Sequence, residues 1–317
     1  MNLLDLNCFA KDFSLSIKAI DKEHFFYALN QIDPYTDSLM KFELFKSFFE
    51  GLRVKGIEPF KYKNEISQKI IENVKNSESF DSFNKMDISK YKNNTNKIIE
   101  NYGLIREKKF QDKNDGEEFV SFDLVTANVQ SLNFIDKSIL KAENFKELVK
   151  KYTNEEYLWA NKKFRQIIFG ELNPKRQQMI QRHIMSIFIN HIMENAYLDN
   201  ESEVEITSDE IIVKKKNLRL SPSEIIDKSP EEIIDINFRV EEFKIEKIHK
   251  ATPYYLCIFK DKKKISNTPA KHMLEVVKYL ESKDDYPENI VEKDKYFLDN
   301  GRSSMFLDNL FESKDSN

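Results

Sequence analysis

The chain has 317 residues, of which 40% are hydrophobic and 33% are charged, and its 50 basic and 54 acidic side chains give a net charge of -4. This composition supplies a hydrophobic core, which excludes wholesale disorder, and the charge excludes binding of nucleic acid through bulk positive charge. The six glycines form neither G-x-G-x-x-G nor a P-loop motif, which argues against Rossmann and P-loop sites. We find no signal peptide, no apolar run long enough to span a membrane and only two distant cysteines, so we predict a cytoplasmic protein with no membrane partner.

Residues 1–115 are predicted to form a helical region, because apolar residues recur there at helical spacing. We expect helices over 12–31 and 38–52, separated at Asp33-Pro34, and a loop with short helices over 73–96. The simplest interpretation of the many phenylalanines in this region is core packing.

A strand is expected after the Asn114-Asp115-Gly116 turn, because residues in 117–123 alternate between two faces. It should end near Asp123, and a turn or helix should begin near Thr126. Helices are then expected over 142–152, over 155–170 and from Pro174 to about Tyr197, the last apolar on most sides and therefore buried.

The remaining chain alternates between strands and helices. Residues 203–215 indicate a hairpin with Ser208-Asp209 in its turn, and the Ser-Pro pairs at 221–222 and 229–230 are typical helix starts. We further expect strands over 243–248 and 254–259, a helix over 269–282 and a frayed tail after Phe311.

Two acidic positions and one basic segment are the candidates for chemistry. Asp123 ends one strand and Asp209-Glu210 lie in a hairpin, and two acids on neighbouring strands can share divalent cations that promote phosphoryl transfer. Residues 161–183 carry six Lys or Arg side chains and one acid, and such cations can hold a triphosphate.

The order of these elements resembles motifs A, B and C of the palm-domain nucleic-acid polymerases, and the detail is similar to family A. Asp123 with Asn128 five residues later resembles motif A, and Arg165 four residues before Phe169-Gly170 resembles the fingers helix. Ser208-Asp209-Glu210 resembles the motif C hairpin, with Ser in place of His. The match covers residues 117–215, about a third of the chain.

This resemblance implies an α+β fold with a helical N-terminal region (1–115), a palm/fingers-like catalytic core (116–240) and a thumb-like strand-helix region (241–317). The core would contain a small antiparallel palm-like sheet and a buried long helix. The implied function is a small nucleic-acid polymerase, a nucleotidyltransferase that uses two Mg²⁺ (or Mn²⁺) ions and acts on nucleic acid and nucleoside triphosphates.

The resemblance also implies a role for each site residue. Asp123 and Asp209 would ligate metal, assisted by Glu210, and Lys162 and Arg165 would contact triphosphate. Asn128 and Gln130 would face sugar or template. Three further cations would contact the phosphate backbone: Lys175, Arg176 and Arg182.

Purely structural roles are the alternative interpretation of the same residues. Asp209 could be an ordinary turn residue, Asp123 could cap a helix, and the basic helix could be a solvated face or bind an acidic partner. His183 and His191 are eight residues apart near Glu194, which allows metal ligation but fits hydrogen-bonded helix histidines better. The alternative function is therefore a non-catalytic nucleic-acid-binding or structural interaction protein.

Overall fold

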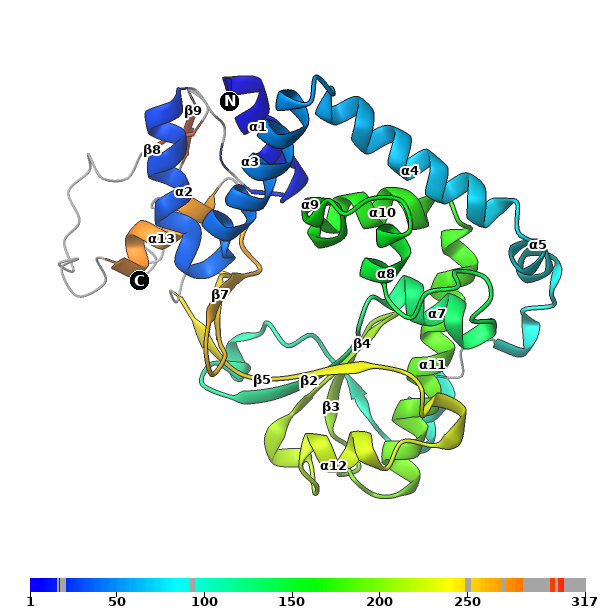
Figure 1. Ribbon diagram of the computed structural model, residues 1–317. Coiled ribbons are helices and arrows are strands. Elements are labelled where there is room, and N and C mark those ends of the chain that lie inside the picture. Colours follow the sequence, from blue (N-terminus) through cyan, green and yellow to red (C-terminus); the bar gives the residue numbers. More distant parts are fainter. Residues whose placement is uncertain are drawn as a thin grey trace, which may run out of the picture. The chain divides into compact units, whose positions relative to one another are not determined.

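The computed structural model describes residues 1–15, 17, 21–91, 95–248, 252–269, 272–281, 297–299 and 302–304. The fold is α+β, as predicted, with a helical N-terminal region and a mixed β-sheet (Figure 1). The chain divides into two compact units. Unit 1 comprises residues 1–56, 110–117 and 244–317, and unit 2 comprises residues 57–109 and 118–243.

The N-terminal helices of unit 1 enclose a phenylalanine-rich core. These helices are α1 (Leu3–Asp12), α2 (Lys22–Thr36) and α3 (Ser38–Val54). The Phe9 ring lies 5.1 Å from that of Phe42 and 5.3 Å from that of Phe45, and all three side chains are buried. Core packing therefore accounts for these aromatic residues, as predicted.

The predicted helix over 12–31 is wrong in its extent. Asp12 ends α1, and α2 begins only at Lys22, where the Asp21 carboxylate caps the helix by accepting from the His24 backbone N–H at 2.7 Å. Pro34 does not break α2 but lies in its last turn, and the helix ends at Thr36, followed by Asp37 as a C-cap in the left-handed conformation.

The strands of unit 1 are antiparallel. Strand β6 (Tyr255–Ile258) pairs with the end of β5 (Phe238–Lys247) on one side and with β7 (Lys263–Ser266) on the other. The remaining elements of the unit are η2 (Asp112–Asn114), α13 (Met273–Glu281), β8 (Phe297–Asp299) and β9 (Arg302–Ser304). The helix predicted over 269–282 is confirmed within residues 273–281, and the predicted frayed tail lies outside the described residues.

The sheet of unit 2 is built around β2 (Glu118–Leu124). Strand β2 pairs antiparallel with β4 (Glu210–Lys214), which forms a hairpin with β3 (Glu203–Ile206). Strand β1 (Ile105–Arg106) pairs parallel with β3, and β5 follows β2 in the strand order β1-β3-β4-β2-β5. The predicted strand end near Asp123 and the predicted hairpin are thus both confirmed.

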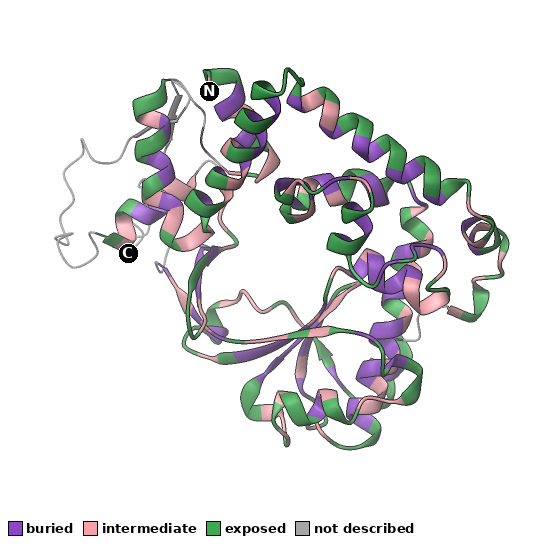
Figure 2. Ribbon diagram, viewed as in Figure 1, coloured by how far each residue is buried: buried purple, intermediate pink, exposed green. Residues whose placement is uncertain are grey.

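Helix α11 (Pro174–Glu194) is the long buried helix of unit 2. Its Phe188 ring lies 5.3 Å from Phe122 on β2 and 4.5 Å from Phe238 on β5, so α11 packs against one face of the sheet. Figure 2 shows how buried and exposed residues alternate along the helices, for example along α4 (Pro59–Lys75). The predicted length of α11 is confirmed to within three residues.

Apart from α11 and α4, the described helices of unit 2 are short. The predicted helix over 155–170 is interrupted at Asn161, whose buried side chain accepts from the Phe164 N–H at 3.0 Å and starts a new helix. Ser221 starts a helix, as predicted, and the structure adds a capping box there, whereas the second Ser-Pro pair precedes only one 3₁₀ turn. The short elements are α5 (Glu78–Lys85), η1 (Ser89–Tyr91), α6 (Thr95–Asn101), α7 (Ala127–Ile135), α8 (Phe145–Lys150), α9 (Glu156–Ala160), α10 (Lys162–Gly170), η3 (Lys215–Asn217), α12 (Pro222–Asp227) and η4 (Glu231–Ile233).

Among the described helices, none combines the length and the apolar character that crossing a membrane requires.

Candidate active site

Asp123 and Glu210 lie directly opposite each other on neighbouring strands of unit 2. The register of β2 and β4 pairs Asp123 with Glu210, and paired residues of an antiparallel ladder project from the same face of a sheet. The Leu124 N–H donates to the Asp209 carbonyl at 2.8 Å, which fixes the hairpin turn beside the end of β2. The fold therefore brings together the three acids that the sequence predicted as catalytic.

The hairpin turn is held by hydroxyl groups. The Thr207 hydroxyl accepts from the Glu210 N–H at 3.0 Å, and the Asp209 carboxylate accepts from the hydroxyls of Thr207 and Ser208 at 3.2 and 3.1 Å. On β2, the Ser121 hydroxyl donates to the Glu210 carboxylate at 2.6 Å. These hydrogen bonds orient both acids, and none of them neutralises a charge.

Arg239 supplies a cation to this group of acids. It lies near the start of β5, and its guanidinium donates to the Asp123 carboxylate and lies 3.6 Å from Glu241. Its side chain is 58% exposed, whereas that of Asp123 is 20% exposed. Sequence reasoning missed Arg239, which lies in β5 ahead of the strand predicted over 243–248, in a part of β5 whose burial does not alternate regularly.

The environment raises the pKa of Asp123. Burial is the largest cause, and the nearby carboxylates of Glu210 and Asp209 act in the same direction, whereas Arg239 lowers the pKa. The net direction shows that one arginine does not compensate the three acids and the loss of solvent. An additional cation would therefore stabilise the charged form of Asp123.

Arg165 is the second cation close to Asp123. It lies on α10, half-buried, with its guanidinium 6.0 Å from the centre of the Phe145 ring. Burial lowers the pKa of Arg165, the charge of Arg239 lowers it further and the charge of Asp123 raises it. Arg165 thus interacts electrostatically with both Asp123 and Arg239. We call the five residues Asp123, Asp209, Glu210, Arg165 and Arg239 the charged cluster.

A buried amide network positions the helices around this cluster. The Asn128 side chain on α7 donates to the Gln177 amide oxygen on α11 at 2.8 Å. Gln177, which is fully buried, donates in turn to the carbonyls of Phe169 and Leu172 at 3.3 and 2.6 Å, just where α10 ends. Asn128, predicted to contact sugar or template, therefore also ties α7 to the end of α10.

Thr126 follows the strand end in a strained conformation. Its φ of 50° lies in the left-handed region, which is unusual for a β-branched residue, and its buried hydroxyl has no hydrogen-bond partner among the residues that the structure describes. The preceding residue, Val125, is held in place because its backbone N–H donates to the Asn237 carbonyl at 3.0 Å. Such strain is concentrated at functional sites, and the sequence carried no signal of it.

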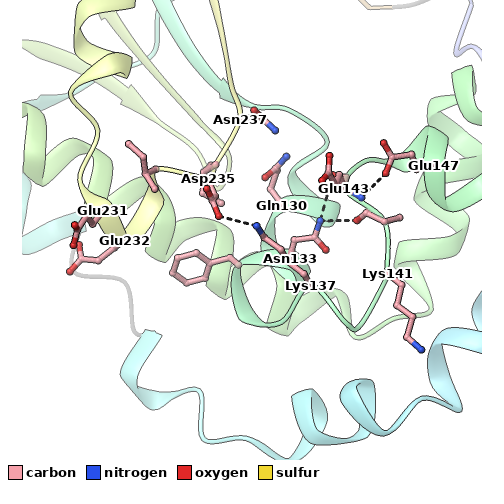
Figure 3. A pocket seen from close by; sticks show the side chains of 14 residues that line it. Gln130, Asn133, Lys137, Lys141, Glu143, Glu147, Glu231, Glu232, Asp235 and Asn237 are labelled. Carbon is pink, nitrogen blue, oxygen red and sulfur yellow. Dashed lines mark hydrogen bonds and ion pairs between the residues drawn. The ribbon is translucent and has the colours of Figure 1, made fainter.

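The remaining predicted residues lie on α7, α10 and α11. Lys162, Lys175 and Arg182 are exposed, whereas Arg176 donates to the Met86 carbonyl and lies 5.4 Å from the centre of the Phe83 ring. Gln130 is buried on α7 and lines a separate cavity (Figure 3).

The histidines considered as metal ligands have other environments. The His183 ring lies 5.1 Å from Tyr91 and 6.1 Å from Phe134, and burial lowers its pKa. The His191 Nδ1 lies 3.2 Å from the Asn195 amide nitrogen. Across the described ranges, no group of three or more His, Cys, Asp or Glu side chains is placed to hold a metal ion by itself.

Comparison of the chain with protein-family models, with curated proteins and with solved structures gives no significant match. Inference about function therefore rests on the geometry and charge of the site.

Proposed function

We propose that the protein is a metal-dependent nucleotidyltransferase, a small nucleic-acid polymerase that uses Mg²⁺ or Mn²⁺. The observation that carries this proposal is the charged cluster, in which Asp123 and Glu210 face each other on paired strands and Asp123 interacts electrostatically with Arg165 of a basic helix. Phosphoryl transfer needs carboxylates that hold divalent cations and fixed positive charges that stabilise the triphosphate. The cluster supplies both kinds of group on rigid elements.

The donor set suits Mg²⁺ bound together with a substrate. Mg²⁺ in such sites is commonly held by one or two carboxylates, with water and substrate phosphates completing its shell. Asp123 and Asp209 would supply the carboxylates, with Glu210 assisting, and the raised pKa of Asp123 marks a site that lacks positive charge. When bound, the metal would activate the attacking hydroxyl and stabilise the leaving pyrophosphate.

The protein's own side chains would then position the substrate. With the metal ion bound, Asp123 would contact the ion in place of the exposed Arg239, and Arg239 would then contact the phosphates. Arg165 and the exposed Lys162 are three residues apart, so they share one side of α10 and would bind the triphosphate. The Thr126 hydroxyl lies close to Asp123 in sequence, and a ligand would satisfy its hydrogen-bonding capacity.

Nucleic acid would lie along α7 and α11. Asn128 would face sugar or template, and the exposed Lys175 and Arg182 would contact the phosphate backbone. Gln130, predicted for the same role as Asn128, instead lines the separate cavity beside α7 and is not part of this proposal. Arg176 would join them only after leaving the Met86 carbonyl. Binding through these cations should weaken as salt rises.

One observation favours the second candidate, a non-catalytic nucleic-acid-binding or structural interaction protein. Asp123 forms an ion pair with Arg239, and such a pair can serve structure alone. In that case the exposed cations of α10 and α11 would bind phosphate or an acidic partner, and the acids would hold the sheet together.

Primer extension separates the two candidates. Wild-type protein is incubated with labelled primer–template, all dNTPs or all NTPs, and Mg²⁺ or Mn²⁺, beside Asp123→Ala and Asp209→Ala. We expect extension by the wild type and a loss of about 1000-fold or more in each variant, because each removes a metal ligand. Asp81→Ala is the control, since Asp81 pairs with Lys85 on the exposed side of α5, outside the charged cluster.

Absence of primer extension would favour the second candidate. If no substrate is extended while salt-sensitive nucleic-acid binding survives both substitutions, the catalytic proposal fails and the binding protein is favoured. Circular dichroism and thermal unfolding of each variant distinguish this result from loss of folding.

A further inference from the structure

A polar cavity of about 910 Å³ lies beside α7 in unit 2 (Figure 3). Helix α7, the segment that joins it to α8, and the segment from η4 to the start of β5 form its walls. This volume is within the range of small-molecule sites. The cavity is distinct from the charged cluster, because none of the five residues of that cluster lines it.

The walls of the cavity carry excess negative charge. Two lysines and five acids line it, a formal charge of -3. One lysine, Lys137, is already paired with Asp235 at 2.9 Å, and Glu147 accepts from the backbone N–H of Glu143 at 2.9 Å. Glu143, Glu231 and Glu232 remain without an ion pair in the described part of the chain. A ligand that carries phosphate would be repelled here.

Buried amides provide a second and independent sign of a ligand. Gln130 is 4% exposed and lines the cavity. The Asn133 side chain donates to the Ala142 carbonyl at 2.9 Å, and its buried oxygen has no hydrogen-bond partner within the described ranges. Buried polar groups are usually satisfied, so this acceptor indicates a bound group that donates hydrogen bonds.

A metal ion does not fit this arrangement. Its acids are distributed around a large cavity, and the described residues contain no group of three or more that could hold a metal. An elongated organic cation fits better, because its separate ammonium groups reach acids that are far apart. Phe134 adds an aromatic ring against which such a cation can pack.

We infer that this cavity binds a linear aliphatic polyamine, whose ammonium groups are received by Glu143, Glu232 and the amides of Gln130 and Asn133. The site is independent of the proposed polymerase activity. Its ligand would be donor-rich and cationic, the opposite of the triphosphate expected at the charged cluster.

Isothermal titration with spermidine tests the inference on full-length protein freed of nucleic acid. We expect one saturable site whose affinity falls with salt. The double variant Glu143→Gln, Glu232→Gln should bind about tenfold more weakly, because it loses two charged acceptors. Lys141→Gln should bind a few-fold more tightly, because it removes an exposed positive charge from the wall. Glu194→Gln, an exposed charge outside the cavity, is the matched control.

The affinity is expected to fall in the double variant and to rise in Lys141→Gln. Misfolding would weaken binding in every variant, so these opposite changes distinguish an effect on binding from misfolding. Gln130→Leu, which removes the buried amide, should also weaken binding. The inference is overturned if spermidine shows no saturable binding, if Mg²⁺ at equal charge displaces it completely, or if all variants bind like Glu194→Gln. Binding of oligolysine without binding of spermidine would assign the cavity to a basic protein segment and also overturn it.

Discussion

Two Asp–Arg pairs in this molecule have opposite electrostatic settings. In unit 1, the Asp5 carboxylate accepts two hydrogen bonds from Arg53, at 2.8 and 2.7 Å, and a third from the Asn2 N–H at 2.9 Å. These bonds lower the pKa of Asp5, with Arg53 the largest cause and burial acting against it. In unit 2, Asp123 is bonded to Arg239 and faces two further acids, and its pKa is raised, mainly by burial.

This difference separates a structural pair from a candidate functional one. Asp5 is 1% exposed, yet its charge is fully satisfied, as is typical of an ion pair that holds helices together. Burial and like charges disfavour the charged form of Asp123, and groups with such perturbed pKa values are concentrated at functional sites. The comparison therefore predicts that losing Asp5 affects stability and that losing Asp123 affects function.

The largest expected effect on stability comes from Asp5→Ala. The substitution removes the ion pair with Arg53 and the reciprocal half of the capping box of α1, so we expect the free energy of unfolding to fall by about 3 kcal/mol. Urea denaturation measures this loss. Asp81→Ala, which removes an exposed i,i+4 pair with Lys85, should cost only about 0.5 kcal/mol. Equal losses in the two variants would contradict the structural role of Asp5.

Much of the fold around these pairs could be predicted from local sequence patterns. The alternation in 117–123, the turn at Ser208-Asp209 and the apolar stripe of α11 each depend on neighbouring residues, and the structure confirms all three elements. The boundaries of α1 and α2 were missed, because apolar spacing continued across a break fixed by the Asp21 cap.

The composition of the candidate site could be predicted only in part. The acids and Arg165 were identified from the sequence, but Arg239 is 116 residues from Asp123 and meets it only through the pairing of strands. The bond between Asn128 and Gln177 spans 49 residues and was likewise not predictable. Long-range partners depend on register and packing, which a local pattern does not specify. The catalytic roles stay predictions.

The two aspartates should also respond to pH in opposite directions. The folded-state pKa of Asp5 is lowered, so its stabilisation is present above the ordinary pKa near 4 and is lost as pH falls through the folded-state pKa. The folded-state pKa of Asp123 is raised, so the folded protein binds that proton more tightly, and stability is lost as pH rises from the ordinary pKa near 4 through the raised folded-state pKa.

Asparagine substitutions measure this contrast. At pH 7, Asp5→Asn should destabilise the protein by about 2 kcal/mol, whereas Asp123→Asn should stabilise it by about 1 kcal/mol, because it relieves an uncompensated buried charge. Both differences should shrink as the pH is lowered toward about 3. Thermal unfolding over this pH range provides the measurement, and destabilisation by Asp123→Asn at pH 7 would show that Arg239 compensates the charge after all.

The smallest effect on stability is expected for Arg239→Gln, which breaks the other half of the Asp123 pair. The Arg239 side chain is 58% exposed, so its removal should change the free energy of unfolding by less than about 0.5 kcal/mol. The same substitution should raise the pKa of Asp123 further, because Arg239 is the group that lowers it. Titration of the Asp123 carboxyl carbon by NMR detects that shift, and Arg239→Lys, which keeps the charge, should largely preserve the wild-type pKa. An unchanged pKa in Arg239→Gln, or a stability loss as large as that of Asp5→Ala, would place Asp123 and Asp5 in one structural class and remove the electrostatic argument for a cation site at Asp123.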